Sequence, residues 1–170
     1  MGRIFSRLEM LDRLNAQIAA GSPVLAAGPA NGIVAKCAAR GGADLIVSSP
    51  MHTPRSMGFP TRVIADFGGE ESKKMIEIFW QVVSSAPLVV GLDANDILSI
   101  DHEKLLDRFA DTGISGVANL PSVQHFGDPY RTRSTKMRRG FNREVELLER
   151  SHASDLFTVG FVYYPDAARA

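Results

Sequence analysis

Apolar and polar residues alternate in blocks along the chain, and the lengths of the blocks indicate an α/β fold. Five short, nearly continuous apolar runs begin near residues 24, 44, 88, 115 and 156. Runs of this kind are typical of strands that are buried on both faces of a parallel sheet. Between the runs, apolar residues recur every three or four positions, which predicts amphipathic helices.

The first predicted helix precedes all the strands and covers residues 5–20. Leu8, Leu11, Leu14 and Ile18 would share its apolar face. The remaining helices are predicted over residues 32–40, 70–86, 99–114 and 142–155, with the first turn of another at 165–170. The strands are predicted over residues 23–28, 43–49, 87–93, 116–120 and 156–164.

The connections differ in length on the two sides of the predicted sheet. Turns from a helix into the next strand are short, whereas residues 50–68 and 121–140 are predicted to form long loops after strands. Asp101 is the expected N-cap of the helix between these loops. Long loops after strands are typical of a (β/α) barrel, which builds its functional site there. We therefore predict one domain over residues 1–170, a partial TIM (β/α)8 barrel of about five parallel strands with an N-terminal helix.

The barrel is expected to be incomplete. A typical TIM barrel needs about 250 residues. This chain has 170 residues, so three βα units are expected to be absent. A lone five-stranded sheet would expose its two edge strands and an apolar face. We therefore expect the chain to associate with itself as a homo-oligomer.

Composition and charge exclude several classes of protein. Apolar residues make up 45% of the chain and charged residues 22%, as in a soluble globular protein. The 19 basic residues balance the 19 acidic ones, so no net charge would attract nucleic acid or an anionic membrane. Cys37 is the single cysteine, which excludes an internal disulfide and a cysteine zinc site. We find no signal peptide and no apolar run long enough to span a membrane, so we expect a cytoplasmic protein.

The acidic pair Asp93 and Asp96 is the first candidate site. Both residues follow the apolar run PLVVGL, at the carboxyl end of a predicted strand, where α/β proteins place ligands. Mg²⁺ takes oxygen ligands and keeps several waters, so the pair could hold this ion and stabilise a developing enolate or phosphoryl charge. The alternative is a turn in which Asp and Asn side chains bond their own backbone.

Two further candidates lie at the ends of other predicted strands. Asn119 lies near the end of the fourth strand, where its amide could orient a substrate; an internal hydrogen bond is the alternative. Gly28, Asn31 and Gly32 belong to the turn GPANG after the first strand, which leads into a helix N-terminus that attracts anions. A tight turn that needs glycine is the alternative for this second candidate.

Basic and hydroxyl residues complete the candidate substrate contacts. The segment YRTRSTKMRR, residues 130–139, could close over the barrel mouth and bind a phosphate or carboxylate, with Arg131 as the contact. A solvated, mobile loop is the alternative. Ser48 ends the second predicted strand and Tyr163 ends the fifth, so both could also face a ligand, although plain packing would explain Tyr163.

Three stretches of the sequence carry a family resemblance: AAGPANGIVAKCAARGGADLIV, GISGVANLPSV and FNREVELLERSHASDLFTVGFVYYPDAARA. They resemble the phosphoenolpyruvate hydrolase-like family, also labelled TIM-barrel signal transduction proteins, from about residue 8 to the last residue. The resemblance implies an eight-stranded barrel distantly related to phosphoenolpyruvate mutase and isocitrate lyase, enzymes that use Mg²⁺ held by carboxylates to stabilise an enolate. Relatives usually carry an aromatic-Asn-Ser-Gly-Arg type of loop after the second strand, where this chain has SSPMHTPRSMGF.

The residues and the resemblance together predict a hydrolase or lyase that uses Mg²⁺. Its substrate would be a small anionic acid, such as a phosphonate or a 2-oxo acid, and its catalytic residues would be Asp93, Asp96 and Asn119. The alternative is a non-catalytic barrel remnant that serves as a regulatory or protein-interaction module. The expected truncation motivates this alternative, because a site shared among eight strands is not expected to work with five.

Overall fold

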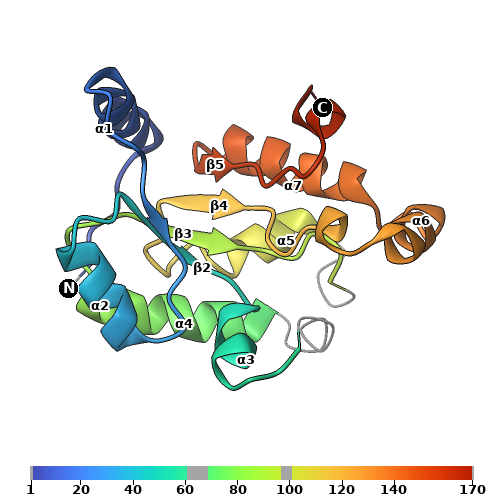
Figure 1. The fold of residues 1–170 in the computed structure, drawn as a ribbon, viewed down its shortest axis with the longest axis horizontal. Helices are drawn as coiled ribbons and strands as arrows, with labels where there is room; N and C mark the ends of the chain where they lie inside the picture. Colours follow the sequence, from blue (N-terminus) through green and yellow to red (C-terminus); the bar gives the residue numbers. More distant parts are fainter. Residues whose placement is uncertain (1, 61–68, 97–100, 170) are drawn as a thin grey trace.

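Five parallel strands form one sheet, and strands that are neighbours in the chain are neighbours in the sheet (Figure 1). The computed structural model describes residues 2–60, 69–96 and 101–169. The sheet order β1-β2-β3-β4-β5 skips no strand, as in the first five units of a TIM barrel. The strands are β1 Ala26–Ala27, β2 Leu45–Ser48, β3 Leu88–Gly91, β4 Gly116–Ala118 and β5 Phe157–Val159.

Helices connect the strands in the predicted alternation. Val90 of β3 lies opposite Ser48 of β2 on one side and Val117 of β4 on the other. Since all the strands point the same way, their carboxyl ends lie along one edge of the sheet.

The helices are α1 Arg7–Ala19, α2 Gly32–Arg40, α3 His52–Ser56, α4 Gly69–Val82, α5 His102–Asp107, α6 Asp128–Lys136 and α7 Phe141–Ala153, with 3₁₀ helices η3 Val123–His125 and η4 Pro165–Arg169. Among the described residues, no helix is both long and apolar enough to cross a membrane.

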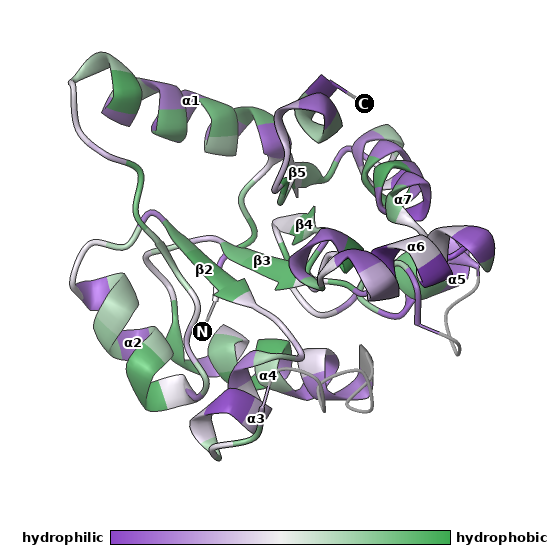
Figure 2. Ribbon diagram, turned by 45° about the vertical axis from the view of Figure 1, so that its right-hand side comes forward, coloured by the Kyte–Doolittle hydropathy of each residue, from purple (hydrophilic) through white to green (hydrophobic). Residues whose placement is uncertain are grey.

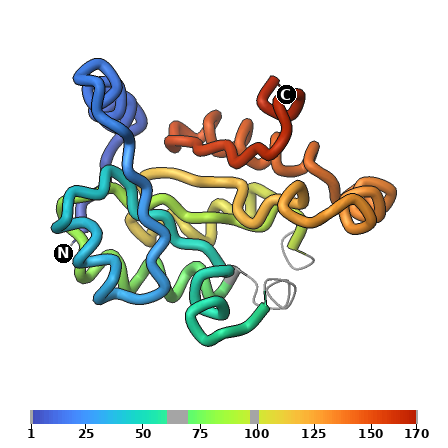
Figure 3. Tube along the Cα trace, in the orientation of Figure 1, coloured from blue at the N-terminus to red at the C-terminus, as the bar shows by residue number. Residues whose placement is uncertain are grey.

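The two faces of the sheet carry separate apolar clusters. On the helix face, Ile46 and Val90 pack with buried residues of α2 and α4. On the opposite face, which we call the inner face, Val89 packs with Phe5 and Met10 from the N-terminal part of the chain. Figures 2 and 3 show α1 and the C-terminal segment on one side of the sheet and α4 on the other. The expectation of an exposed apolar sheet face is therefore wrong for this part of the sheet, because the N-terminal segment covers it.

Helix α1 buries a different side from the one that the sequence pattern predicts. Met10 is 1% exposed, whereas Leu8 and Ile18 are 66% and 63% exposed. Of the predicted apolar face, Leu14 packs against the inner-face cluster. The physical reason is position, because α1 meets the sheet at β5 and therefore buries only the side that it turns toward the inner face.

Both segments predicted as long loops contain helices. Residues 50–68 include α3, and residues 121–140 include η3 and α6; residues 61–68 lie outside the described part of the chain. The loop predictions are wrong because α6 has no apolar stripe, so its sequence shows no helical period. Its start is marked instead by Pro129 in the first turn, a position that tolerates proline.

The fifth strand is shorter than the apolar run that predicts it. β5 ends at Val159, so Tyr163 lies beyond the strand and not at its end. The reason is visible at Phe161, whose backbone N–H and carbonyl oxygen both bond the side chain of Asn119. Because those backbone groups bind a side chain, Phe161 does not extend the ladder with β4.

Candidate functional site

The loop after β3 carries Asp93 at the carboxyl edge of the sheet. Leu92 and Ala94 both pack in the apolar cluster of the helix face. Asp93 lies between them, so alternation of side chains along the extended chain turns it to the inner face. Asp93 therefore lies where the sequence predicts it, at the carboxyl end of a parallel strand.

Asp93 is a carboxyl group held largely out of water. Burial is the main cause that raises the pKa of Asp93 to about 6; a hydrogen bond from Asn95 opposes the rise, Asp96 reinforces it and Arg139 opposes it. Oδ1 of Asp93 accepts the backbone N–H of Asn95 at 2.8 Å, so the Asx-type bond of the alternative interpretation is present. A carboxylate has two oxygens, so this bond does not exclude a ligand on the other one.

Asp93 and Asp96 are the two carboxylates of this loop that could hold Mg²⁺. The N–H of Asp96 donates to the carbonyl oxygen of Asp93 at 3.2 Å. The charge of Asp96 helps to raise the pKa of Asp93, and a divalent cation would relieve this repulsion. Across residues 2–60, 69–96 and 101–169, no group of three His, Cys, Asp or Glu side chains could hold an ion. Water and substrate oxygens would therefore supply the remaining ligands, as is usual for Mg²⁺.

Asn95, between the two acids, is the residue that sequence reasoning missed at this loop. Neither Oδ1 nor Nδ2 of its buried amide has a hydrogen-bond partner in the described structure. Leaving a buried polar group unsatisfied costs about 1–3 kcal/mol, so a water or a ligand that bonded this amide would stabilise it. An Asn within DAND is typical of a turn, which is why the sequence gives no separate signal for it.

Asn119 lies in a buried network with Glu144. Nδ2 of Asn119 donates to Oε2 of Glu144 at 2.6 Å and to the carbonyl oxygen of Phe161 at 3.0 Å, and Oδ1 accepts the N–H of Phe161 at 2.6 Å. Both Asn119 and Glu144 are 0% exposed. The internal hydrogen bond that is the alternative for Asn119 is therefore present, and a direct contact with substrate stays a prediction.

Glu144 is a second carboxyl group with a raised pKa, about 7. Burial is the largest cause; hydrogen bonds from the N–H of Val123 and from Asn119 oppose it, and the charge of Asp93 reinforces it. Sequence reasoning missed Glu144, because the charged run REVELLER is typical of a solvent-exposed helix surface. Only tertiary contacts reveal that this position faces the end of β4.

The turn after β1 is shaped by packing and by helix capping. Asn31 is the N-cap of α2, and its side chain accepts a backbone N–H of the first turn at 3.0 Å. A Cβ at Gly32 would lie 2.9 Å from Ile78, and one at Gly28 would lie 2.7 Å from the ring of His52. The turn that needs glycine is therefore present, and anion binding at this turn stays a prediction.

The remaining candidate contacts lie on three different elements. Ser48, on β2, is 1% exposed, and its Oγ is buried without a partner in the described structure. Arg131, on α6, has its guanidinium carbon 4.7 Å from the ring centre of Tyr164. Tyr163 lies beyond β5, where its hydroxyl is 2.9 Å from Nδ1 of His125. Of the three, Arg131 is the one that lines a basic cavity.

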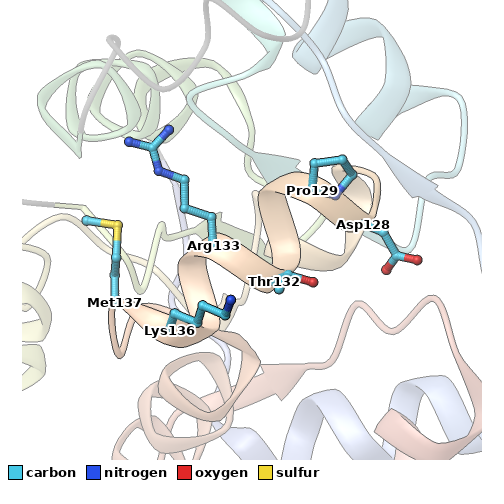
Figure 4. A pocket seen from close by; sticks show the side chains of 6 residues that line it. All are labelled: Asp128, Pro129, Thr132, Arg133, Lys136 and Met137. Atoms are coloured by element: carbon cyan, nitrogen blue, oxygen red, sulfur yellow. The ribbon is translucent and has the colours of Figure 1, made fainter.

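That cavity lies between α6 and the start of α7 and has a volume of about 690 Å³. The cations Arg131, Lys136, Arg138 and Arg143 line it, together with one acid, Glu146. Thr132 and Lys136 also line an adjoining hollow of about 610 Å³ on α6 (Figure 4). Cations gathered around one hollow favour an anionic ligand, and Arg in particular matches the geometry of carboxylates and phosphates.

Nearly the whole chain matches one known family. The model of the family described as phosphoenolpyruvate hydrolase-like matches residues 9–170. The chain belongs to the phosphoenolpyruvate hydrolase-like family. The resemblance seen in the sequence is thereby confirmed.

Curated relatives of this family member are much longer than the chain. The ToMV susceptible protein tm-1(GCR26) of Solanum lycopersicum is 29% identical over 168 residues, which are 96% of this chain and 22% of that protein. The putative transcriptional regulatory protein y4pA of Sinorhizobium fredii (strain NBRC 101917 / NGR234) is 30% identical over a match of 170 residues, and this match covers 94% of this chain and 27% of that protein. The chain thus spans between 22% and 27% of these relatives.

Solved structures of barrel enzymes share the fold. A phosphonopyruvate hydrolase in complex with oxalate and Mg²⁺ has a TM-score of 0.60 and 18% identity, over 95% of this chain and 55% of that one. A 2,3-dimethylmalate lyase, a member of the PEP mutase/isocitrate lyase superfamily, has a TM-score of 0.55 and 17% identity, over 89% of this chain and 52% of that one. These likenesses confirm the predicted fold class, a partial TIM barrel of five parallel strands.

Proposed function

We propose that this protein is a hydrolase or lyase of the phosphoenolpyruvate mutase/isocitrate lyase type, acting on a small anionic acid such as a phosphonate or a 2-oxo acid. The observation that carries the proposal is the acidic pair Asp93 and Asp96 at the carboxyl end of β3, with the unpartnered amide of Asn95 between them. Family membership and the oxalate and Mg²⁺ of the similar phosphonopyruvate hydrolase support it.

The residues of the loop after β3 have distinct roles in this proposal. Asp93 and Asp96 would hold Mg²⁺, which when bound supplies positive charge to stabilise a developing enolate. The amide of Asn95 would donate a hydrogen bond to a substrate oxygen. Asn119 would not contact the substrate; its hydrogen bond to Glu144 would hold the end of β4 in place.

Anion recognition would use the basic cavity between α6 and α7. Arg131 and Lys136 could bind a carboxylate or phosphonate there with charge-assisted hydrogen bonds. Gly28, with the first turn of α2, would offer a weaker anion site, and Ser48 and Tyr163 remain secondary contacts. The cavity supports an acidic substrate better than the other candidates do, because several cations share it.

A non-catalytic role, as a regulatory or protein-interaction module, is the second candidate. The names of the curated relatives favour it, because one is a ToMV susceptible protein and the other a putative transcriptional regulatory protein. In this role the acidic pair would be part of a turn and nothing more.

Calorimetric titration with Mg²⁺, in the presence and absence of oxalate, tests the enzyme proposal. We expect the wild type to bind Mg²⁺ and oxalate to strengthen that binding. Asp93→Asn and Asp96→Asn should each weaken it by at least about tenfold, since each removes one of two charged ligands. The matched control is Asp12→Asn on exposed α1. The enzyme proposal fails if the wild type binds no Mg²⁺ or if the control behaves like the site variants.

A further inference from the structure

Two adjacent residues at the start of α7 reach two different loops at the carboxyl edge of the sheet. Arg143 donates from Nε to the carbonyl oxygen of Ala94 at 3.1 Å, in the loop after β3. Glu144 accepts the N–H of Val123 at 2.7 Å, in the loop after β4. Because α7 packs against both β4 and β5, its first turn is a fixed point from which both loops are held.

Basic side chains bond the backbone carbonyl oxygens of the loop after β3. Arg139 donates from Nη2 to the carbonyl oxygen of Asn95 at 2.6 Å. Nε2 of buried His102 lies 3.2 Å from the carbonyl oxygen of Ala94 and 3.0 Å from Nη2 of Arg143. Hydrogen bonds with a charged partner are stronger than neutral ones. These contacts therefore fix the backbone between the two acids of the candidate site.

The loop after β4 is held through a buried carboxyl group. Glu144 receives donors from Val123 and Asn119, and Asn119 in turn bonds both backbone groups of Phe161. One side chain of α7 thereby ties the loop after β4 to the segment beyond β5. A fully buried carboxyl group lowers the stability of the fold unless such bonds compensate for its burial. An apolar residue at this position would pack α7 against the sheet equally well, so the carboxyl group is needed for its hydrogen bonds.

We propose that Arg143 and Glu144 are positioning residues: the first turn of α7 sets the geometry of the loops after β3 and β4, and through them the direction of the acidic pair. The link to ligand binding rests on the proposed function of Asp93 and Asp96. The link to loop geometry does not, and it can be measured by itself.

Amide hydrogen exchange measures the geometric part. Arg143→Met should speed exchange at Asn95 and Asp96 by at least about tenfold, because their loop loses the bond that holds the carbonyl oxygen of Ala94. Glu144→Gln leaves one acceptor oxygen for two donors, so exchange should rise as much at Val123, if its N–H loses the acceptor, or at Phe161, if Asn119 does. The matched controls, Arg150→Met and Glu149→Gln, change the same residue types farther along α7. Exchange that rises across the whole molecule, or equally in the controls, would overturn the proposal in favour of a merely structural role.

A paired substitution distinguishes the loss of one hydrogen bond from a general loss of stability. In Glu144→Gln, the amide has one acceptor oxygen for the donors of Asn119 and Val123, so its NH₂ meets one of these donors. Adding Asn119→Asp provides an acceptor for that NH₂ and leaves the glutamine oxygen to Val123. The double variant should therefore show wild-type protection at Val123 and at Phe161, whose N–H keeps an acceptor on the aspartate. Exchange that stays as fast as in Glu144→Gln contradicts the assigned hydrogen bonds.

Mg²⁺ titration of the same variants tests the link to the site. Arg143→Met and Glu144→Gln should weaken Mg²⁺ binding about tenfold or more, while both controls bind like the wild type. If the wild type binds no Mg²⁺, the proposed function fails, and the exchange pattern still decides the positioning role. If Mg²⁺ binds and its affinity is unchanged in both variants, the acidic pair does not depend on α7 and the proposal is overturned.

Discussion

Asp93 is the residue whose protonation is expected to control metal binding. Its pKa of about 6 means that the carboxylate predominates above pH 6 and the neutral acid below it. Mg²⁺ binds the carboxylate, so affinity should fall by about tenfold for each pH unit below 6 and level off above it. Calorimetric titrations across this range check the prediction. A flat profile in the wild type, or a wild-type profile in Asp93→Asn, would show that Asp93 is not a ligand.

Glu144 should make the stability of the fold depend on pH in an unusual direction. Its pKa is raised from 4.5 to about 7, so between these values the folded chain keeps a proton that the unfolded chain has lost. Folding is therefore favoured at the acidic end of this window, and stability falls as pH rises through it. The fall amounts to at most about 3 kcal/mol, at 1.36 kcal/mol per pKa unit.

Urea denaturation of the wild type and of Glu144→Gln, at several pH values between 4.5 and 7, isolates this contribution. The difference in unfolding free energy between the two proteins should change with pH, because the glutamine does not titrate. Asp93 is present in both proteins, so its own titration cancels apart from its coupling to the charge of Glu144. A difference that stays constant with pH would mean that Glu144 is ionised throughout and that its hydrogen bonds outweigh its burial.

At the scale of single elements, α2 offers a way to separate capping from anion binding. Asn31 caps this helix through one hydrogen bond, and replacing it by alanine should cost about 1 kcal/mol of stability. An aspartate at the same position would cap equally well but would repel an anion at the helix N-terminus. We therefore expect Asn31→Asp to match the wild type in denaturation, with Asn31→Ala less stable. If Asn31→Asp also leaves oxalate affinity unchanged, the turn after β1 binds no anion.

The bounds of a helix were predictable where its own residues determine where it starts and ends. α2 spans Gly32–Arg40 as predicted from its glycines, and Asp101 caps α5 as expected. α6 was not predictable by period, since its helix shows no apolar stripe. The site divides in the same way: the position of Asp93 follows from its strand, whereas the roles of Glu144 and Asn119 depend on contacts 25 residues apart in the chain.

At the scale of the whole molecule, the sheet keeps two edges. β1 and β5 each pair with a single neighbour in the part of the chain that the structure describes. Exposed apolar side chains lie near these edges and on α1: Val24 and Leu25 before β1, Val162 after β5, and Leu8 and Ile18 on α1. Unpaired strand edges beside exposed apolar side chains are favourable sites for association between chains.

Self-association through α1 is therefore the prediction that belongs to the whole molecule. Sedimentation velocity should show a dimer or larger species of the wild type, and Leu8→Glu with Ile18→Glu should weaken it by at least about tenfold, because two charges would be buried in the contact. Ala16→Glu is the matched control, since residue 16 is exposed on another side of the same helix. The inner-face cluster does not include Leu8 or Ile18, so the double variant should fold normally as a monomer. The prediction is wrong if the wild type stays monomeric as its concentration rises, or if Ala16→Glu dissociates as much as the double variant. Either result would show that this side of α1 is exposed to solvent and forms no contact between chains.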